Sequence, residues 1–173
     1  MIPERFRKRR IALPYDHGAY ALFLGPLVIG LAAGARWHVA CVYLVVASSA
    51  AFLMRQPLTV LVMIGAGRRT AADRPAAWFW LLAYGAVAAA HITGLVLRGF
   101  GFVLHLAVPG ALVAGWHLLL VRRRAERRQM LLEVLASGVL ALAAPAAFWV
   151  GSERYDPMGW LLWVLVWAGS ATS

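Results

Sequence analysis

The sequence predicts an all-α protein, a polytopic bundle of about six membrane-spanning helices with a cytoplasmic N-terminus. Three observations predict this class. First, 62% of the 173 residues are hydrophobic and only 14% are charged, whereas about a quarter of the residues in soluble domains are charged. Second, apolar runs of roughly 20 residues, the length that crosses a bilayer, recur along the chain. Third, the basic residues cluster at the ends of these runs.

The apolar runs divide the chain into its expected spans. They cover residues 19–35, 37–54, 76–97, 100–121, 130–150 and 158–173. We expect a single integral membrane domain over residues 1–173, in which residues 1–14 form a basic cytoplasmic N-terminus. The last run reaches residue 173 without a basic anchor, so we also expect the C-terminus to be incomplete.

Residues 55–69 are the ambiguous segment. Their apolar middle is about ten residues long, and a helix of that length covers roughly 15 Å, half of the hydrocarbon core. Pro57 lies near the start of the segment, where the first turn of a helix tolerates proline. We therefore expect a short interfacial or re-entrant helix near residues 55–69. The alternative is a seventh span, which would invert the orientation of everything after it.

The placement of Lys and Arg favours six spans over seven. With six spans, only Arg36, Arg98 and Arg154 of the seventeen basic residues lie outside. The inner residues are Arg5, Arg7, Lys8, Arg9, Arg10, Arg55, Arg68, Arg69, Arg74, Arg122, Arg123, Arg124, Arg127 and Arg128. This bias predicts the bacterial cytoplasmic (inner) membrane. Because the charges lie at span ends rather than in one patch of a soluble fold, we expect the lipid bilayer and no nucleic acid as a partner.

Two glycines in the first span form a GxxxG pattern, Gly30 and Gly34. Small residues at this spacing let two helices approach closely. The partner helix either belongs to the same chain or to a second copy in a homo-oligomer, and the pattern alone leaves both open.

Polar residues at the inner mouth of the first span need an explanation. Asp16 and His17 precede Gly18 there. Asp16 is suited to capping the helix and complementing its dipole. The functional alternative is a head-group or proton site, because histidine exchanges protons near neutral pH and glycine allows close backbone approach.

Glu133 lies about one turn into the fifth span, inside an apolar run. It either snorkels toward the arginines of residues 122–128, or it lines an inward-facing pocket at the depth of His17 and Arg55. In such a pocket, arginines would hold a phosphate and an intramembrane proline would shape the cavity. We therefore take His17 and Glu133 as catalytic candidates. The substrate-binding candidates are Asp16, Gly18, Arg55, Arg122, Arg123 and Pro145.

Histidines also lie on the outer side. His91 is near the outer end of the third span and His105 is near the outer start of the fourth, at depths that suit a haem held between adjacent helices. His105 and His117 are 12 residues apart, or about 120° out of phase on a helix, which does not suit a pair of ligands from one span. Packed interfacial histidines are the alternative, and we expect no cofactor and no metal.

Several segments resemble one family. DHGAYALFLGPLVIG (residues 16–30) resembles the N-terminal signature of the YwiC-like family of small bacterial membrane proteins. FLMRQPL (52–58), the segment from residue 127 to 151 and the final run from residue 160 are similar to later elements of that family. The resemblance implies the same helical topology but no biochemical activity. The candidate functional positions that it marks are His17, Gly18, Arg55, Pro57, Glu133 and Pro145.

The favoured function is binding or modifying a lipid-soluble substrate, such as an isoprenoid, quinone or phospholipid, at a cytoplasm-facing polar pocket. The sequence does not decide whether the protein is an enzyme. It has three aspartates and no Asp-rich pair of the kind that holds magnesium and diphosphate in polytopic prenyltransferases. The alternatives are a non-catalytic accessory subunit of a respiratory or other membrane complex, with membrane-protein partners, and a small-solute transporter that acts as an oligomer.

Overall fold

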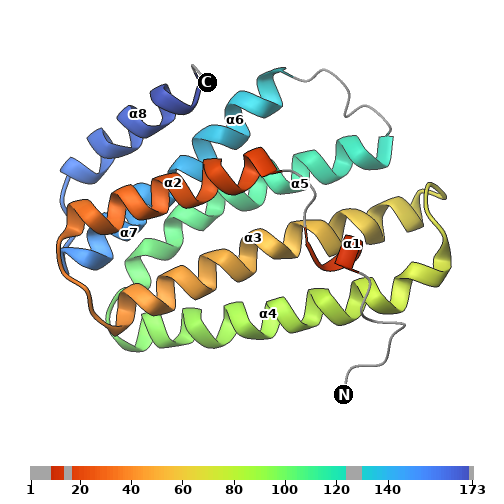
Figure 1. Ribbon diagram of the computed structural model, residues 1–173, viewed down its shortest axis with the longest axis horizontal. Helices are drawn as coiled ribbons and strands as arrows, with labels where there is room; N and C mark the ends of the chain where they lie inside the picture. Colours follow the sequence, from red (N-terminus) through yellow and green to blue (C-terminus); the bar gives the residue numbers. More distant parts are fainter. Residues whose placement is uncertain (1–8, 14–16, 124–129, 172–173) are drawn as a thin grey trace.

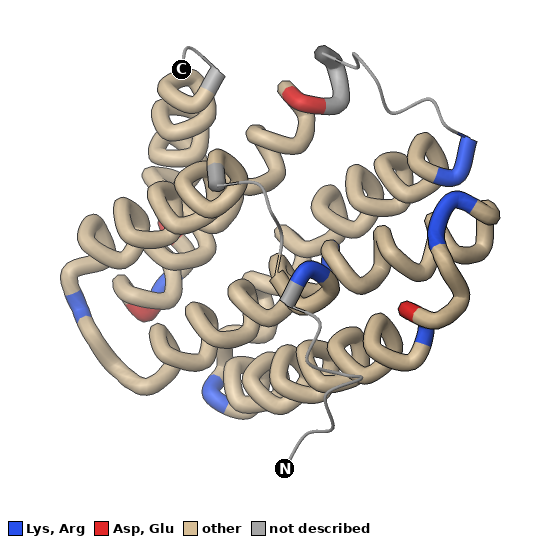
Figure 2. The backbone as a smooth tube through the Cα atoms, turned by 45° about the vertical axis from the view of Figure 1, so that its right-hand side comes forward, with Lys and Arg blue, Asp and Glu red and all other residues tan. Residues whose placement is uncertain are grey.

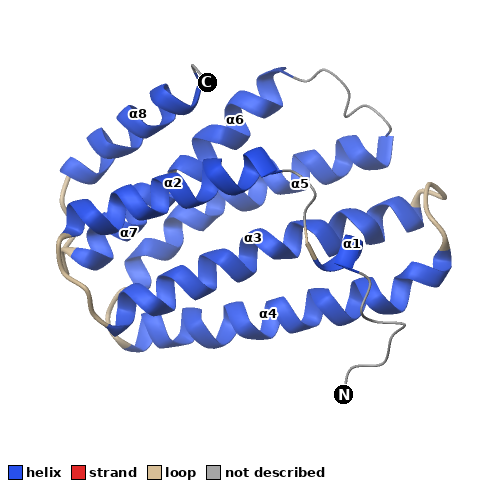
Figure 3. Ribbon diagram, viewed as in Figure 1, coloured by secondary structure: helices blue, strands red, loops and turns tan. Residues whose placement is uncertain are grey.

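The computed structural model describes residues 9–13, 17–123 and 130–171, and its regular elements in these ranges are all helical (Figures 1 and 3). The predicted all-α bundle is therefore confirmed. In chain order the elements are α1 (Arg9–Ala12), α2 (His17–Gly34), α3 (Val39–Gly65), η2 (Ala71–Asp73), α4 (Arg74–Leu97), η3 (Gly101–Leu106), α5 (Ala107–Arg123), α6 (Met130–Ala141), α7 (Ala143–Gly151) and α8 (Met158–Ala171).

The long helices have the length and composition of membrane spans. Four segments of the described chain are long and apolar enough to cross a bilayer, Val39–Gly65, Ala71–Leu97, Gly101–Arg123 and Glu133–Gly151. Two shorter apolar helices accompany them, and the chain reverses direction at alternate ends of the bundle (Figure 1). Few apolar side chains of α4 and α5 are buried inside the bundle. Because only lipid suits such a surface, the chain is a helical membrane protein.

The expected short interfacial or re-entrant helix at residues 55–69 is not a separate element. Instead, α3 continues without interruption through Pro57 to Gly65. An internal proline removes one backbone hydrogen bond and can bend a helix, but Pro57 is buried within α3, which runs through Arg55 and Gln56 without a break. The turn comes at Gly67, whose φ is +68°, where the Arg68 N–H donates to the Met63 carbonyl at 2.8 Å. The stop signal is thus this glycine and not the proline.

The GxxxG pattern packs within the chain, where α2 crosses α7. A Cβ atom added at Gly30 would lie 2.2 Å from the Ala144 carbonyl oxygen, and one at Gly34 would lie 2.9 Å from the Gly151 Cα. Real side chains do not tolerate such distances, so the two backbones touch only because both positions are glycine. The intramolecular alternative therefore accounts for this face of α2.

The predicted fifth span is broken into α6 and α7 at Leu142. The Leu142 N–H donates to the Val139 carbonyl at 3.1 Å, one residue short of α-helical pairing, and Pro145 has no N–H to offer the preceding turn. The Gly138 carbonyl, left without its usual helical donor, accepts a hydrogen bond from the Trp163 indole at 2.8 Å. The break is thus stabilised by a side chain from α8, as backbone polar groups in a membrane require.

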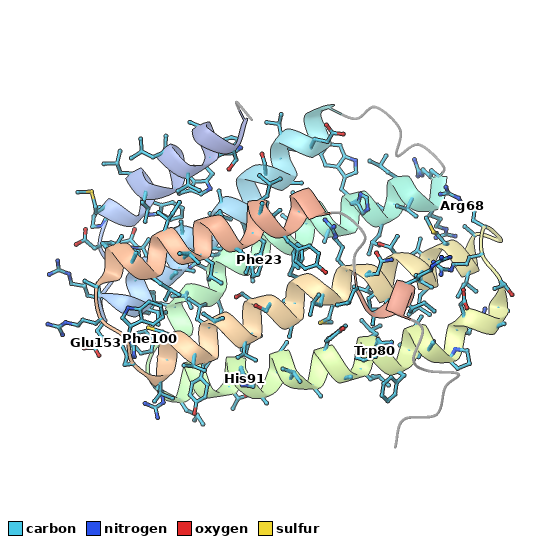
Figure 4. All side chains as sticks on the ribbon, in the orientation of Figure 1. Phe23, Arg68, Trp80, His91, Phe100 and Glu153 are labelled. Carbon is cyan, nitrogen blue, oxygen red and sulfur yellow. The ribbon has the colours of Figure 1, made fainter. Side chains whose placement is uncertain are left out.

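One end of the bundle, here called the Glu153 end, joins α2 to α3 and α7 to α8. The Arg36 guanidinium lies 3.5 Å from the Glu153 carboxylate, and Arg154 lies 3.1 Å from Asp156. The His38 ring donates to the Val150 carbonyl at 2.8 Å. Figure 4 labels Glu153 at this end, far from Arg68 at the other. The loops at the Glu153 end are therefore tied together by ion pairs and hydrogen bonds.

The opposite end, here called the Arg68 end, joins α3 to α4 and ends α5. The Arg68 guanidinium donates to the Val121 carbonyl at 2.6 Å, and Arg69 pairs with Asp73 at 2.8 Å. Lys and Arg residues gather at this end in Figure 2. The Arg68 bond satisfies a carbonyl in the last turn of α5, where helices lack internal donors, so it fixes α5 relative to α3.

The short helix α1 packs against α3 and α4. Ile11 is fully buried in a cluster with Val60 and Ile64. The Gln56 side chain donates to the Arg10 carbonyl, and the Tyr84 hydroxyl donates to the Ala12 carbonyl, each at 3.1 Å. These contacts hold the described part of the N-terminal segment on the bundle, while residues 1–8 and 14 of that segment lie outside the described ranges.

Candidate functional site

A pocket of about 210 Å³ lies between α3, α5 and α6. Twelve residues line it, and ten of them are apolar. The two polar lining residues are Arg55 on α3 and His117 on α5. The site thus combines an apolar wall with one permanent positive charge, because arginine does not lose its proton in proteins.

Small side chains keep the three helices from filling this space. Ala51, Gly110, Ala114 and Ala136 all line the pocket. A Cβ atom added at Gly110 would meet only the Val139 side chain, at 3.5 Å, which is an ordinary contact. Helices usually use small residues to approach closely, but here the facing surfaces stay apart and leave a cavity.

The guanidinium of Arg55 is positioned by an aromatic stack. Its central carbon lies 5.3 Å from the centroid of the Phe52 ring. Phe52 in turn stacks on Phe23 at 4.9 Å and meets the edge of Tyr20 at 5.4 Å, both from α2. Figure 4 shows Phe23 in the middle of the bundle. Helix α2 therefore supports the pocket wall from behind, and the cation–π contact holds the charge there.

The N-terminal candidates lie near this stack. His17 is the first residue of α2, about one turn before Tyr20, and Gly18 is exposed beside it. Asp16 and the side chain of His17 lie outside the described residues. The predicted proximity of His17 to Arg55 therefore stays a prediction.

Glu133 lies one turn from the pocket on α6. It precedes the lining residues Ala136 and Leu140 by three and seven positions, so it shares their helical stripe. Its side chain is exposed, and in the described part of the chain it forms no ion pair with the arginines of α5. Glu133 therefore lies beside the pocket and not in its wall.

The remaining substrate-binding candidates lie away from the pocket wall. Arg122 and Arg123 are exposed in the last turn of α5, at the Arg68 end. The arginines at residues 124, 127 and 128 fall outside the described ranges. Pro145 is buried in α7 and follows Val139, which does line the pocket, across the helix break. Pro145 is therefore not a lining residue; it lies on the other side of the helix break from the pocket.

Sequence reasoning missed His117 as a pocket residue. It had considered this histidine only as a haem ligand paired with His105. His117 follows Gly110 and Ala114 by seven and three positions, and all three line the pocket. A stripe of two small residues and a histidine on one face of a span is the signal that would have found it.

The two histidines considered as haem ligands, His91 and His105, have separate surroundings. The His91 Nδ1 bonds to the Val87 carbonyl at 2.8 Å, and its ring lies beside Tyr43. The His105 Nδ1 bonds to the Phe102 carbonyl, and its ring packs against Trp149 and Trp160. Within the described ranges, no group of three or more His, Cys, Asp or Glu side chains is placed to hold a metal ion. Each ring thus contacts its own set of neighbours, and the haem hypothesis and its alternative both stay predictions.

The arrangement suits recognition more than bond-making. An apolar wall binds a hydrocarbon or prenyl chain, and a guanidinium with five N–H donors binds a polar head. Acid–base chemistry would need a titratable group within reach of the pocket; His117 lines it, and Glu133 lies one turn from it on α6.

Comparison with known proteins gives one match. No curated protein and no solved structure matches the chain. The family described as YwiC-like protein matches residues 13–148, which include α2 through most of α7 and the whole pocket. The chain belongs to the YwiC-like family.

Proposed function

We propose that this protein binds a lipid-soluble small molecule, an isoprenoid, quinone or phospholipid, in the pocket between α3, α5 and α6. The supporting observation is a guanidinium and an imidazole placed in an otherwise apolar pocket, within helices that are apolar enough to cross a membrane. A purely apolar ligand gains nothing from these polar groups, and a water-soluble ligand would need more of them. An amphiphile uses both kinds of surface.

In this proposal the protein lies in the bacterial cytoplasmic (inner) membrane with its N-terminus in the cytoplasm. The basic residues at the Arg68 end then face the cytoplasm, in keeping with the positive-inside rule. Arg55 is ten residues before the end of α3, about 15 Å along the helix. The ligand therefore enters from the cytoplasmic half of the bilayer, past the exposed Arg122 and Arg123.

His17 and Glu133 are the groups that we assign to proton transfer, should the bound molecule be modified. Glu133 has the better placement, since it lies one turn from the pocket on the pocket-facing stripe of α6. Binding alone needs neither group. Replacement of Glu133 by Gln is therefore expected to leave ligand binding intact, and to stop turnover if the protein is an enzyme.

The test places a larger side chain in the pocket and measures how much lipid co-purifies with the protein. Ala136→Leu adds a branched side chain at a lining position, and Ala90→Leu adds the same group at an exposed position of α4 as a matched control. Each protein is purified in a mild detergent, and its lipids are extracted for mass spectrometry. We expect one amphiphile in stoichiometric amount with the wild type and Ala90→Leu, and a loss of at least tenfold with Ala136→Leu. Equal amounts in all three samples would contradict the proposal.

A small-solute transporter is the second candidate, because one observation favours it. The α6–α7 break lies next to lining residues Val139 and Leu140, and transporter sites are often formed by interrupted helices. To distinguish transport from binding, the flux of a candidate solute is measured in proteoliposomes that contain the protein. Flux that Ala136→Leu abolishes and Ala90→Leu leaves unchanged would favour transport over binding.

A further inference from the structure

Resting on the proposed function, we infer that the ligand carries an anionic head, a phosphate or carboxylate, and that the Arg55 guanidinium is its recognition group. This inference selects an anionic amphiphile over a neutral one such as a quinone. It depends on where the charge of Arg55 lies and on what surrounds it.

Arg55 is far from both ends of its helix. It stands sixteen residues after Val39 and ten before Gly65, within a 27-residue apolar helix. Its side chain is partly buried in the pocket wall. Burying a charge in an apolar environment costs free energy. Because arginine stays protonated, Arg55 cannot avoid this cost by becoming neutral.

No carboxylate of the described residues neutralises Arg55. Three of the four described acids pair with other arginines, as Asp73 with Arg69, Glu153 with Arg36 and Asp156 with Arg154. The fourth, Glu133, is exposed one turn from the pocket and forms no ion pair with Arg55. The interaction that the structure gives the guanidinium is the Phe52 ring at 5.3 Å.

A ligand head is therefore the group that would supply the missing negative charge. Guanidinium groups bind carboxylate and phosphate through two parallel N–H···O bonds, a geometry that neutral carbonyl heads do not match. His117 lines the same pocket from α5 and adds a polar group opposite α3. The exposed lining residues Ala51 and Ala114 mark where a chain leaves the pocket toward lipid.

The size of the pocket agrees with a head and a short stretch of chain. Its volume is about 210 Å³, whereas pockets that enclose a whole drug-sized ligand measure roughly 300–1,000 Å³. The rest of a long chain would lie outside, along the apolar surface of α5. A single-chain amphiphile meets this requirement most simply.

The test compares probes that differ only in the head. Dodecyl phosphate, dodecanoate, dodecanol and inorganic phosphate are titrated into the full chain in neutral phosphatidylcholine nanodiscs, and binding is read by native mass spectrometry. The variants are Arg55→Gln, Arg55→Lys and Arg98→Gln. Arg98 is the matched control, because its guanidinium also lies over an aromatic ring, Tyr43 at 5.5 Å, but Arg98 does not line this pocket.

We expect the wild type and Arg98→Gln to bind an anionic probe at least tenfold more tightly than dodecanol. Arg55→Gln should reduce this preference to less than twofold while dodecanol binding is unchanged, which also shows that the variant is folded. Arg55→Lys should keep part of the preference, since it retains the charge but not the two-bond geometry. Dodecyl phosphate and dodecanoate distinguish a phosphate from a carboxylate head, and tight binding of inorganic phosphate alone would point to a soluble anion.

Failure of the anionic-head inference and failure of the pocket proposal would give different results. If dodecanol binds as tightly as the anionic probes, or if Arg55→Gln retains the preference, the anionic head is overturned while the pocket proposal stands. If no amphiphile binds the wild type, or if Ala136→Leu binds all of them as the wild type does, the pocket proposal itself is overturned.

Discussion

The Glu153 end and the pocket differ in whether their arginines have a carboxylate partner. Toward the Glu153 end, Arg36 and Arg154 pair with carboxylates of the α7–α8 loop, and Arg98, whose guanidinium lies over the Tyr43 ring, is exposed. In the pocket, the Arg55 guanidinium has the Phe52 ring but no carboxylate among the described residues. Ion pairs of this kind stabilise the fold, whereas a partly buried charge with no counter-ion among the described residues is a candidate for ligand binding.

Packing separates the same two regions. Near the Glu153 end, α2 and α7 touch backbone to backbone, and the neighbouring Trp149 is fully buried. Around the pocket, small residues on α3, α5 and α6 face one another across a cavity. A protein gains stability from the first kind of region and ligand access from the second. Substitutions of the same type should therefore have different effects in the two regions.

The largest difference is expected between two glycines. In Gly30→Ala the new Cβ would lie 2.2 Å from the Ala144 carbonyl oxygen, so α2 and α7 must separate. We expect a loss of about 3 kcal/mol, at the upper end for overpacking, and a Tm that falls by about 6–12 °C. Gly110→Ala meets only Val139 at 3.5 Å and should leave stability unchanged or raise it by up to about 1 kcal/mol. Thermal unfolding of both variants in one detergent measures the contrast, and equal losses would show that the pocket is as tightly packed as the α2–α7 crossing.

A smaller effect is expected from two tryptophans. Trp163→Phe removes the indole donor that lies 2.8 Å from the Gly138 carbonyl at the helix break. An unsatisfied carbonyl in an apolar environment costs about 1–3 kcal/mol, so the free energy of unfolding should fall by that amount. Trp116→Phe, at an exposed position of α5, is the matched control and should change stability by less than about 0.5 kcal/mol. Equal effects would mean that the break is satisfied without Trp163.

The sequence predicts the bundle well because its signals are repeated. Apolar runs, helix-ending glycines and basic residues at run ends each recur several times, so one misread signal does little harm. The error at residues 55–69 came from Arg55 and Gln56, which interrupt the apolar run and leave an apolar remainder of about ten residues that resembles a separate short helix. Pro57 lies between apolar stretches and stays in the helix, while Gly67 ends it with a positive φ.

The site is less predictable because it depends on which helices are neighbours. Arg55 stands out in the sequence as a charge beside an apolar run, but His117 gains its significance only when α5 is placed beside α3 and α6. Equal depth in the membrane suggested His17 and Glu133 as companions of Arg55, and depth is what a sequence of spans provides. Which helices lie side by side depends on helix packing, and that packing cannot be predicted from the pattern of apolar side chains alone.

The smallest difference in stability is expected between substitutions of two glutamates. Glu→Gln removes the charge but keeps the size of the side chain, so packing is little changed. Glu153→Gln removes the carboxylate that lies 3.5 Å from Arg36, while keeping the size of the side chain. Because this ion pair is largely exposed, we expect a loss of about 0.2–1 kcal/mol that shrinks as salt is added. Glu133→Gln removes a carboxylate that has no arginine partner in the described part of the chain, so the loss that we expect is only that of its interaction with the N-terminal end of α6, at most about 0.3 kcal/mol for an exposed side chain. Unfolding of both variants in low and in high salt measures this difference. A larger salt-dependent loss in Glu133→Gln, equal to that in Glu153→Gln, would place Glu133 in an ion pair, among the charges that the fold neutralises and not among the groups available to the pocket.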